Sequence, residues 1–153
     1  MPAPQVNTYL NNHYEGMTPE KLIHMLFQGA LKHLKHARQG IVDNDPKQRG
    51  EHLSKAIAIV SELNASVDPN MNDESTRFLR GLYTAILSEL PKVSLNNDSG
   101  PIDRTITYIE KLNDIWETEV LNSAEKKQAS AGTAPSRGYG AGSNAGVKKS
   151  LFA

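Results

Sequence analysis

The sequence predicts an all-α fold, an antiparallel four-helix bundle with an N-terminal arm or short helix and a disordered C-terminal tail. Apolar residues recur every three or four positions in four successive segments, a spacing that places them on one face of an α-helix. Short stretches rich in Pro, Asn and Asp separate the segments, and short connections make neighbouring helices antiparallel. No segment shows the alternation of apolar and polar residues that is typical of a β-strand.

The first helix is expected to begin at Thr18-Pro19-Glu20. Threonine suits the cap position, proline suits the first helical turn, and glutamate interacts favourably with the positive end of the helix. The pattern ends near Val42, before a turn sequence. Gly29 lies in mid-helix, where glycine costs about 1 kcal/mol relative to alanine. It indicates either a slightly weak helix position or the close approach of a neighbouring helix or of a client backbone. The apolar face comprises Ile23, Leu26, Phe27, Ala30, Leu34, Ala37 and Ile41.

The other three helices have similar start and stop signals. Asp45-Pro46 opens the second, and Asp68-Pro69-Asn70 ends it because a residue before proline is pushed out of the helical region. The third is expected from Asn72 or Asp73 to Pro91, and the fourth from about Pro101 to Asn122. Their apolar faces comprise Leu53, Ala56, Ile57, Val60, Leu63 and Val67, then Leu79, Leu82, Tyr83, Ile86 and Leu90, then Ile102, Ile106, Ile109, Trp116 and Val120.

The bundle is therefore assigned to residues 18–122. Residues 1–17 are expected to form an arm that caps it, with apolar side chains that include Tyr9 and Leu10. Residues 123–153 are rich in Gly, Ser and Ala and carry five basic residues and one acidic residue, net +4, against −4 for residues 1–122. Such a segment buries too little apolar surface to offset the entropy of ordering. It is interpreted as a solubilising tail or, alternatively, as a carrier of a short docking element at Val147–Ala153.

Composition excludes several classes. No run of 18 apolar residues exists, so no membrane insertion is expected. The N-terminus lacks a secretory signal, and we expect a cytoplasmic protein. The absence of cysteine removes disulfides, thiolate metal sites and cysteine nucleophiles. A net acidic bundle argues against binding to nucleic acid. We expect no catalytic residues, no cofactor and no metal.

Two alternative functions, metal binding and histidine phosphotransfer, would depend on histidine side chains. His33 and His36 lie three positions apart, so both can face one metal ion, but no other strong ligand is obvious nearby. Glu20 and His24 approach the Glu–His pairs of di-iron bundles, without the second copy that such a site requires. A histidine phosphotransfer bundle that uses His33 or His36 is the alternative signalling function, although Gln39 stands where a lysine is expected after His36.

Several apolar residues lie outside the predicted core faces. Leu22 and Met25 lie to one side on the first helix and Ile59 on the second, whereas Phe78 and Leu87 flank the face of the third. Tyr108, Leu112 and Ile115 form a shoulder on the fourth. They either widen the core or line a surface that accepts the apolar face of a partner helix.

The segment from Thr18 to Ala30 resembles the most characteristic stretch of the FliS family of flagellar secretion chaperones. The resemblance continues in order through Leu53–Leu63 in the second helix, Leu79 and Leu82-Tyr83 in the third, and Trp116, and it covers residues from about 5 to 122. Gln28 replaces the family's usual Asp, and the long tail is not typical of the family. The matching positions of the first stretch are Thr18, Pro19, Leu22, Ile23, Met25, Leu26, Phe27, Gly29 and Ala30.

The resemblance implies a non-enzymatic export chaperone. It would bind the C-terminal segment of flagellin in the cytoplasm, prevent premature polymerisation and help deliver flagellin to the type III export apparatus. Components of that apparatus and a flagellar regulator are further candidate partners, and the sequence leaves open whether the exposed apolar surface drives self-association without a client. The arm would cover an apolar patch and move when the client binds. The candidate partner-binding residues are Tyr9, Leu10, Leu22, Met25, Leu26, Ile59, Leu87, Tyr108, Leu112 and Ile115.

Overall fold

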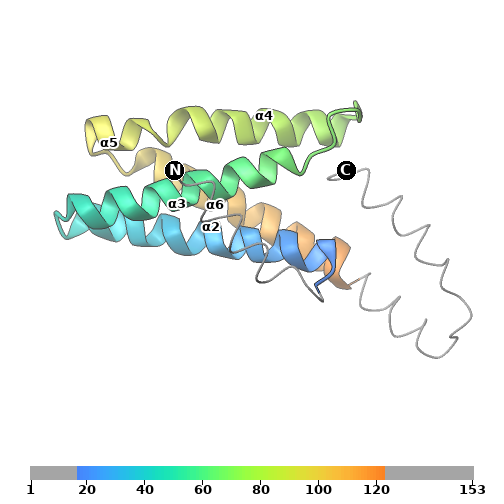
Figure 1. The fold of residues 1–153 in the computed structure, drawn as a ribbon, viewed down its shortest axis with the longest axis horizontal. Helices are drawn as coiled ribbons and strands as arrows, with labels where there is room; N and C mark the ends of the chain where they lie inside the picture. Colours follow the sequence, from blue (N-terminus) through green and yellow to red (C-terminus); the bar gives the residue numbers. More distant parts are fainter. Residues whose placement is uncertain (1–16, 123–153) are drawn as a thin grey trace, which may run out of the picture.

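The structure, a computed structural model, describes residues 17–122, and in this range it is a bundle of helices without strands (Figure 1). The predicted all-α bundle is confirmed, whereas the arm, apart from Met17, and the tail lie outside the described residues. None of the described helices is both long enough and apolar enough to cross a bilayer. The elements are α2 (Pro19–Val42), α3 (Pro46–Ala65), α4 (Glu74–Glu89), α5 (Lys92–Asn96), α6 (Gly100–Ile115) and a π-helical turn, η1 (Trp116–Leu121).

The predicted helix starts are confirmed by their caps. The Thr18 hydroxyl accepts a hydrogen bond from the Lys21 backbone N–H at 3.2 Å, with proline in the first turn. The Asp45 carboxylate accepts one from the Gln48 N–H at 3.1 Å, again with proline following. Each cap satisfies a backbone donor that has no partner within the helix, so these residues fix where α2 and α3 begin.

Two features in the second half of the described chain were not predicted from the sequence. After Pro91 the chain re-enters a helix for one short element, α5, which buries Val93 and ends at Asn97 in a left-handed conformation with φ of 51°. The fourth helix is not a regular α-helix to its end, because it widens into η1 at Trp116. The indole N–H of Trp116 donates to the backbone oxygen of Glu20 at 2.8 Å in a buried position, which ties η1 to the first turn of α2.

Helix α2 is the centre of the bundle. It packs against α3 along most of its length and against α6 and η1 on another side, while α4 packs mainly on α3. Figure 1 shows α4 and α6 approaching each other near α5 and diverging towards the opposite end of the bundle. The helix order is therefore α6, α2, α3 and α4, and α4 and α6 share fewer contacts than the other neighbouring pairs.

The predicted core faces are largely confirmed. Phe27, Leu34, Leu63 and Tyr83 are fully buried, and the rings of Phe27 and Trp116 meet edge to face with centroids 6.3 Å apart. The faces are completed by residues that are partly buried against this cluster, namely Ile41, Ile57 and Leu82.

The prediction that Ile59 lies outside the core face of its helix is wrong. Its side chain is buried in the core, because α3 lies between α2 and α4 and must bury a wider face than one stripe. A Cβ atom on Gly29 would lie 3.2 Å from the Ile59 Cδ1 atom. Gly29 is thus closely packed against α3, but its neighbour is the end of a side chain and not the backbone that sequence reasoning considered.

A tighter contact joins the two helices at Gly40, which sequence reasoning did not select. A Cβ atom there would lie 2.5 Å from the Arg49 backbone nitrogen and 2.9 Å from its Cα atom. Backbone atoms at the start of α3 cannot move aside as a flexible side chain can. Gly40 therefore allows α2 and α3 to approach closely where they meet.

Replacing Gly40 by alanine should lower the free energy of unfolding by about 2 kcal/mol, because the helices must separate locally. Urea unfolding followed by circular dichroism would measure the change. The matched control is Gly81→Ala in α4, where the added Cβ meets nothing within 4 Å. That control should raise stability by about 0.5–1 kcal/mol through helix propensity. Equal effects of the two substitutions would contradict the close contact.

Candidate functional site

Five large apolar side chains are exposed in the described range, and they fall into two groups. Val42 and Leu95 lie at the end of the bundle that carries α5. Phe78, Tyr108 and Ile115 belong to α4 and α6, the two helices that diverge. Exposed apolar side chains that share a surface mark a place for an apolar partner, so the second group is the candidate functional site.

One half of the site is a row of side chains on α6, the α6 row, which consists of Tyr108, Leu112 and Ile115. Their spacing of four and three residues places them on one helical face. Tyr108 is 42% exposed and Ile115 is 52% exposed, while Leu112 is partly buried against the core. The predicted shoulder on the fourth helix therefore exists, and two of its three members are open to solvent.

The other half lies on α4. The Arg104 guanidinium contacts the Glu89 carboxylate at 3.4 Å and so joins one face of α6 to one face of α4. On α4, Leu82 and Phe78 lie seven and eleven residues before Glu89 and therefore on the same helical face. On α6, Tyr108 and Ile115 lie four and eleven residues after Arg104 and share its face in the same way. The two apolar faces therefore start at this ion pair and separate as the helices diverge. We call Phe78, Leu82 and the α6 row together the α4–α6 surface.

Sequence reasoning noted Phe78 but did not select it as a partner-binding residue. The signal was its position on α4, away from the buried face, where it is 63% exposed. What the sequence did not contain was the direction from which α6 approaches α4. That direction follows from the contact between Arg104 and Glu89.

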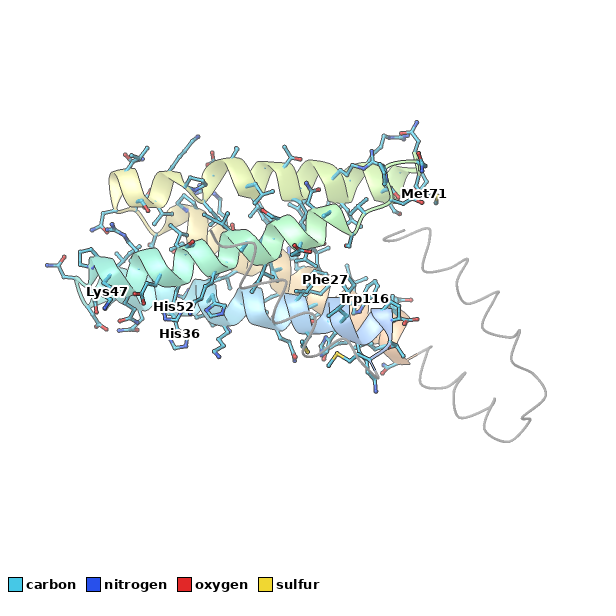
Figure 2. All side chains as sticks on the ribbon, in the orientation of Figure 1. Phe27, His36, Lys47, His52, Met71 and Trp116 are labelled. Atoms are coloured by element: carbon cyan, nitrogen blue, oxygen red, sulfur yellow. The ribbon has the colours of Figure 1, made fainter. Side chains whose placement is uncertain are left out.

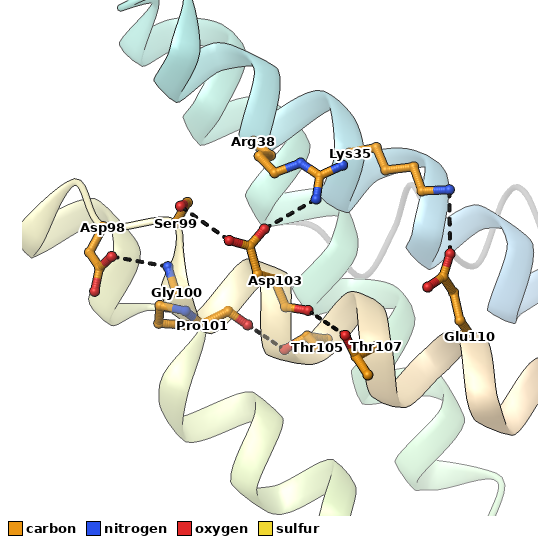
Figure 3. A network of polar contacts seen from close by, with 10 residues as sticks. All are labelled: Lys35, Arg38, Asp98, Ser99, Gly100, Pro101, Asp103, Thr105, Thr107 and Glu110. Atoms are coloured by element: carbon orange, nitrogen blue, oxygen red, sulfur yellow. Dashed lines mark hydrogen bonds and ion pairs between the residues drawn. The ribbon is translucent and has the colours of Figure 1, made fainter.

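Polar contacts hold the opposite edge of α6 against α2. The Lys35 ammonium lies 3.8 Å from the Glu110 carboxylate, and the Arg38 guanidinium donates to Asp103 at 3.1 Å (Figure 3). Further along, a ring nitrogen of His24 lies 2.9 Å from the Asn113 side-chain oxygen. Exposed pairs of this kind contribute little stability each. Their consequence is the orientation of α6, whose apolar row is turned away from α2.

The candidate partner-binding residues of α2 do not lie on the α4–α6 surface. Leu22 and Met25 are partly buried, and Leu22 is on the face of α2 that carries Gly29 towards α3. Leu26 is buried in the core. Tyr9 and Leu10 lie outside the described residues. The structure therefore does not gather the α2 residues and the α6 row on one surface.

Two further predicted residues pack inward from the middle helices. Ile59 is a core residue of α3, and Leu87 is partly buried against the core on α4. Leu87 lies on a different face of α4 from Leu82 and Phe78. Neither side chain is among the exposed large apolar residues, so each supports the bundle from within.

Three histidines, His33, His36 and His52, form a cluster across α2 and α3, and Figure 2 labels His36 and His52. The Nδ1 atoms of His33 and His52 lie 2.9 Å apart, and the ring of His52 stacks on both His33 and His36. Burial, followed by the charges of His52 and Lys55, lowers the pKa of His33 to about 4. The His33 ring in this cluster is therefore neutral near pH 7.

This arrangement bears on the two histidine alternatives. A ring nitrogen binds a metal in the plane of its ring, and nearly parallel stacked rings direct their nitrogens into separate planes. In residues 17–122 no group of three or more His, Cys, Asp or Glu side chains is placed to hold a metal ion. For phosphotransfer, Nδ1 of His33 is engaged by His52, whereas His36 is exposed and stacks on His52. His36 is therefore the exposed candidate of that alternative.

Comparison with known proteins gives one consistent result. The family model described as flagellar protein FliS matches residues 2–124. The flagellar secretion chaperone FliS of Bacillus subtilis is 29% identical over 126 residues, which cover 82% of this chain and 93% of that protein. The flagellar secretion chaperone FliS of Campylobacter jejuni is 32% identical over 117 residues, 76% of this chain and 91% of that protein. The Escherichia coli chaperone of the same name is 32% identical over 67% of this chain and 76% of its own length.

The histidine cluster makes stability depend on pH. His33 has a pKa of about 4 in the folded chain and 6.5 as its ordinary value, so the unfolded chain binds more protons between these values and stability falls as pH falls. After allowance for partial exposure, we expect a loss of about 1 kcal/mol between pH 7 and pH 5. Urea midpoints at the two pH values would measure it.

The variant His33→Gln removes this titration and leaves the carboxylates unchanged. Its loss of stability between pH 7 and pH 5 should be smaller than that of the natural chain. Equal losses in the two chains would show that the cluster does not hold His33 neutral.

Proposed function

This chain belongs to the FliS family of flagellar proteins, which are secretion chaperones and not enzymes, and on that premise we propose that it binds the C-terminal segment of flagellin. It would keep flagellin from polymerising in the cytoplasm and assist its delivery to the flagellar type III export apparatus. The observation that carries the proposal is the α4–α6 surface, where apolar side chains stay open on an otherwise well packed bundle.

The spacing of the α6 row suits a helical client. Tyr108 and Ile115 are seven residues apart, about 10 Å along the helix axis. An amphipathic helix presents its own apolar residues at the same interval and can therefore pack along the row. A segment that is unfolded alone would gain its helix on binding, at an ordering cost of about 2–5 kcal/mol. Only an apolar surface of considerable length offsets that cost.

Each exposed residue contributes a share of the binding energy. Ile115 is 52% exposed, and burying the exposed half of such a side chain contributes about 1 kcal/mol. Tyr108 adds an aromatic face with a hydroxyl that can stay in water. Phe78, on α4, offers the largest exposed fraction of the three. A client that touched both helices would close the open side of the bundle.

The N-terminal arm gives the proposal a second surface. We propose that residues 1–17 cover Leu22 and Met25 through Tyr9 and Leu10, and that the client displaces the arm. Leu22 and Met25 are partly buried on the described part of the chain and have apolar surface left to cover. Leu26 and Ile59 belong to the core, so they would support this surface from beneath, as Leu87 does on α4.

Charge placed in the α6 row should weaken flagellin binding. For Ile115→Asp we expect an affinity at least tenfold lower, because the variant loses an apolar contact worth about 1 kcal/mol and must also remove a carboxylate from water. Isothermal titration calorimetry with the C-terminal segment of a flagellin from the same bacterium would measure it. The natural chain should bind with a large negative heat-capacity change, the mark of apolar burial.

Leu95→Asp is the matched control for this substitution. Leu95 is 84% exposed and lies at the α5 end of the bundle, so the same chemical change there should leave the affinity unaltered. Equal losses from both variants would contradict the α4–α6 surface as the client site. Absence of binding by the natural chain would contradict the choice of client.

Removal of residues 1–14 should raise the affinity for the same segment. The natural chain must first release its arm from Leu22 and Met25, whereas the shortened chain has no such contact to lose. Calorimetry on the two chains would give the ratio of their affinities. Unchanged affinity would show that the arm does not compete with the client, while leaving the α6 row as the binding surface.

A further inference from the structure

We propose that residues 147–153 of the chain itself dock on the α6 row when no client is bound. The segment reads Val147-Lys-Lys-Ser-Leu-Phe-Ala153 and combines an apolar pair with two lysines. It lies outside the described residues, and neither the bundle nor the flagellin proposal uses it. Its role as a competitor of the client rests on the function proposed above, whereas its docking can be tested without any client.

The length of the chain places the segment within reach. The described chain ends at Asn122, directly after η1, about 10 Å along the axis from Ile115 and about 21 Å from Tyr108. Residues 123–146 then form a connection of 24 residues rich in Gly, Ser and Ala. A linker of that composition and length has a root-mean-square span of about 27 Å. The span matches the distance back to the α6 row.

That match turns a weak contact into a populated one. A tethered segment whose linker fits the distance has an effective concentration of about 1 mM or more at its site. A contact as weak as a millimolar dissociation constant would then be about half occupied. Seven residues with one leucine and one phenylalanine can supply an affinity of that order. A client with a longer apolar segment would still displace them.

Charge favours the same docking place. Residues 123–153 carry five basic residues and one acidic residue. The helix formed by α6 and η1 carries five acidic residues against the two basic residues Arg104 and Lys111. Asp103, Glu110 and Glu117 contact basic side chains of α2, so Asp114 and Glu119 are the carboxylates that remain for the tail. Asp114 adjoins Ile115, and Glu119 follows it by one turn, and both are exposed. Lys148 and Lys149 would therefore find carboxylates beside the apolar contact of Leu151 and Phe152.

The test uses the full-length chain and its lack of cysteine. A nitroxide attached at Ser143→Cys lies just before the segment and broadens amide signals near it. We expect loss of the amide signals around Ile115 and Leu112 in the nuclear magnetic resonance spectrum. Signals around Val42 and Leu95, at the other end of the bundle, should persist. Reduction of the nitroxide with ascorbate should restore the lost signals.

The matched control carries Leu151→Ser and Phe152→Ser on the same labelled chain. It keeps the tether and the lysines, so it reports the broadening that chance encounters alone produce. Equal broadening in the two chains would overturn the proposal, as would broadening centred on Val42 or Leu95. In a mixture, the nitroxide chain could also broaden the amide signals of an isotope-enriched chain that carries no nitroxide. That result would overturn the proposal as well, because the occupant would then be a second copy.

Addition of the flagellin segment then separates the two proposals. Recovery of the Ile115 signals would show that client and tail share the α6 row, and the serine variant should bind the client about twofold more tightly. If the tail docks but the flagellin segment neither binds nor restores the signals, the flagellin proposal fails and the docking stands. If flagellin binds and no docking is seen, the reverse holds.

Discussion

The position of α2 between α3 and α6 is the constraint on which the rest of the structure depends. One side of α2 meets α3 so closely at Gly40 that a methyl group would strike the backbone of Arg49. Another side is aligned with α6 by the contacts of Lys35 and Arg38. Both neighbours of α2 are thus fixed in orientation. Helix α4 has no such contact with α2 and is placed through α3 and through one ion pair to α6.

An open side between α4 and α6 follows from this arrangement. A four-helix bundle that is closed on every side buries one apolar stripe per helix. Here α3 buries a wider face, which includes Ile59, while α6 buries one face and leaves Tyr108 and Ile115 exposed. Apolar surface that the bundle does not cover is available to a partner. The same geometry that stabilises α2 therefore leaves the apolar surface proposed for the client at a distance from it.

The helix boundaries could be predicted from the sequence because local chemistry sets them. Thr18 and Asp45, each followed by proline, cap their helices in the structure as the sequence indicates. Features that depend on three-dimensional neighbours could not be predicted. The burial of Ile59 depends on α4 covering the second side of α3, and the partnership of Phe78 with the α6 row depends on the Arg104–Glu89 contact. Helical spacing locates a residue on its own helix, but not the helix that will face it.

The π-helical turn ties the end of the α6 row to the first turn of α2. Trp116 directly follows Ile115, the last member of the α6 row, and its indole N–H donates to the backbone oxygen of Glu20. Glu20 in turn precedes Leu22 on α2 by only two residues. The contact is buried and is supported by the edge of the Phe27 ring, so it fixes the end of the α6 row relative to the start of α2. A client that followed the α6 row to its end would reach the first turn of α2 on the side that contacts Trp116. Leu22 lies on the side of α2 that carries Gly29 towards α3, so a client that also displaced the proposed arm would have to continue around this turn.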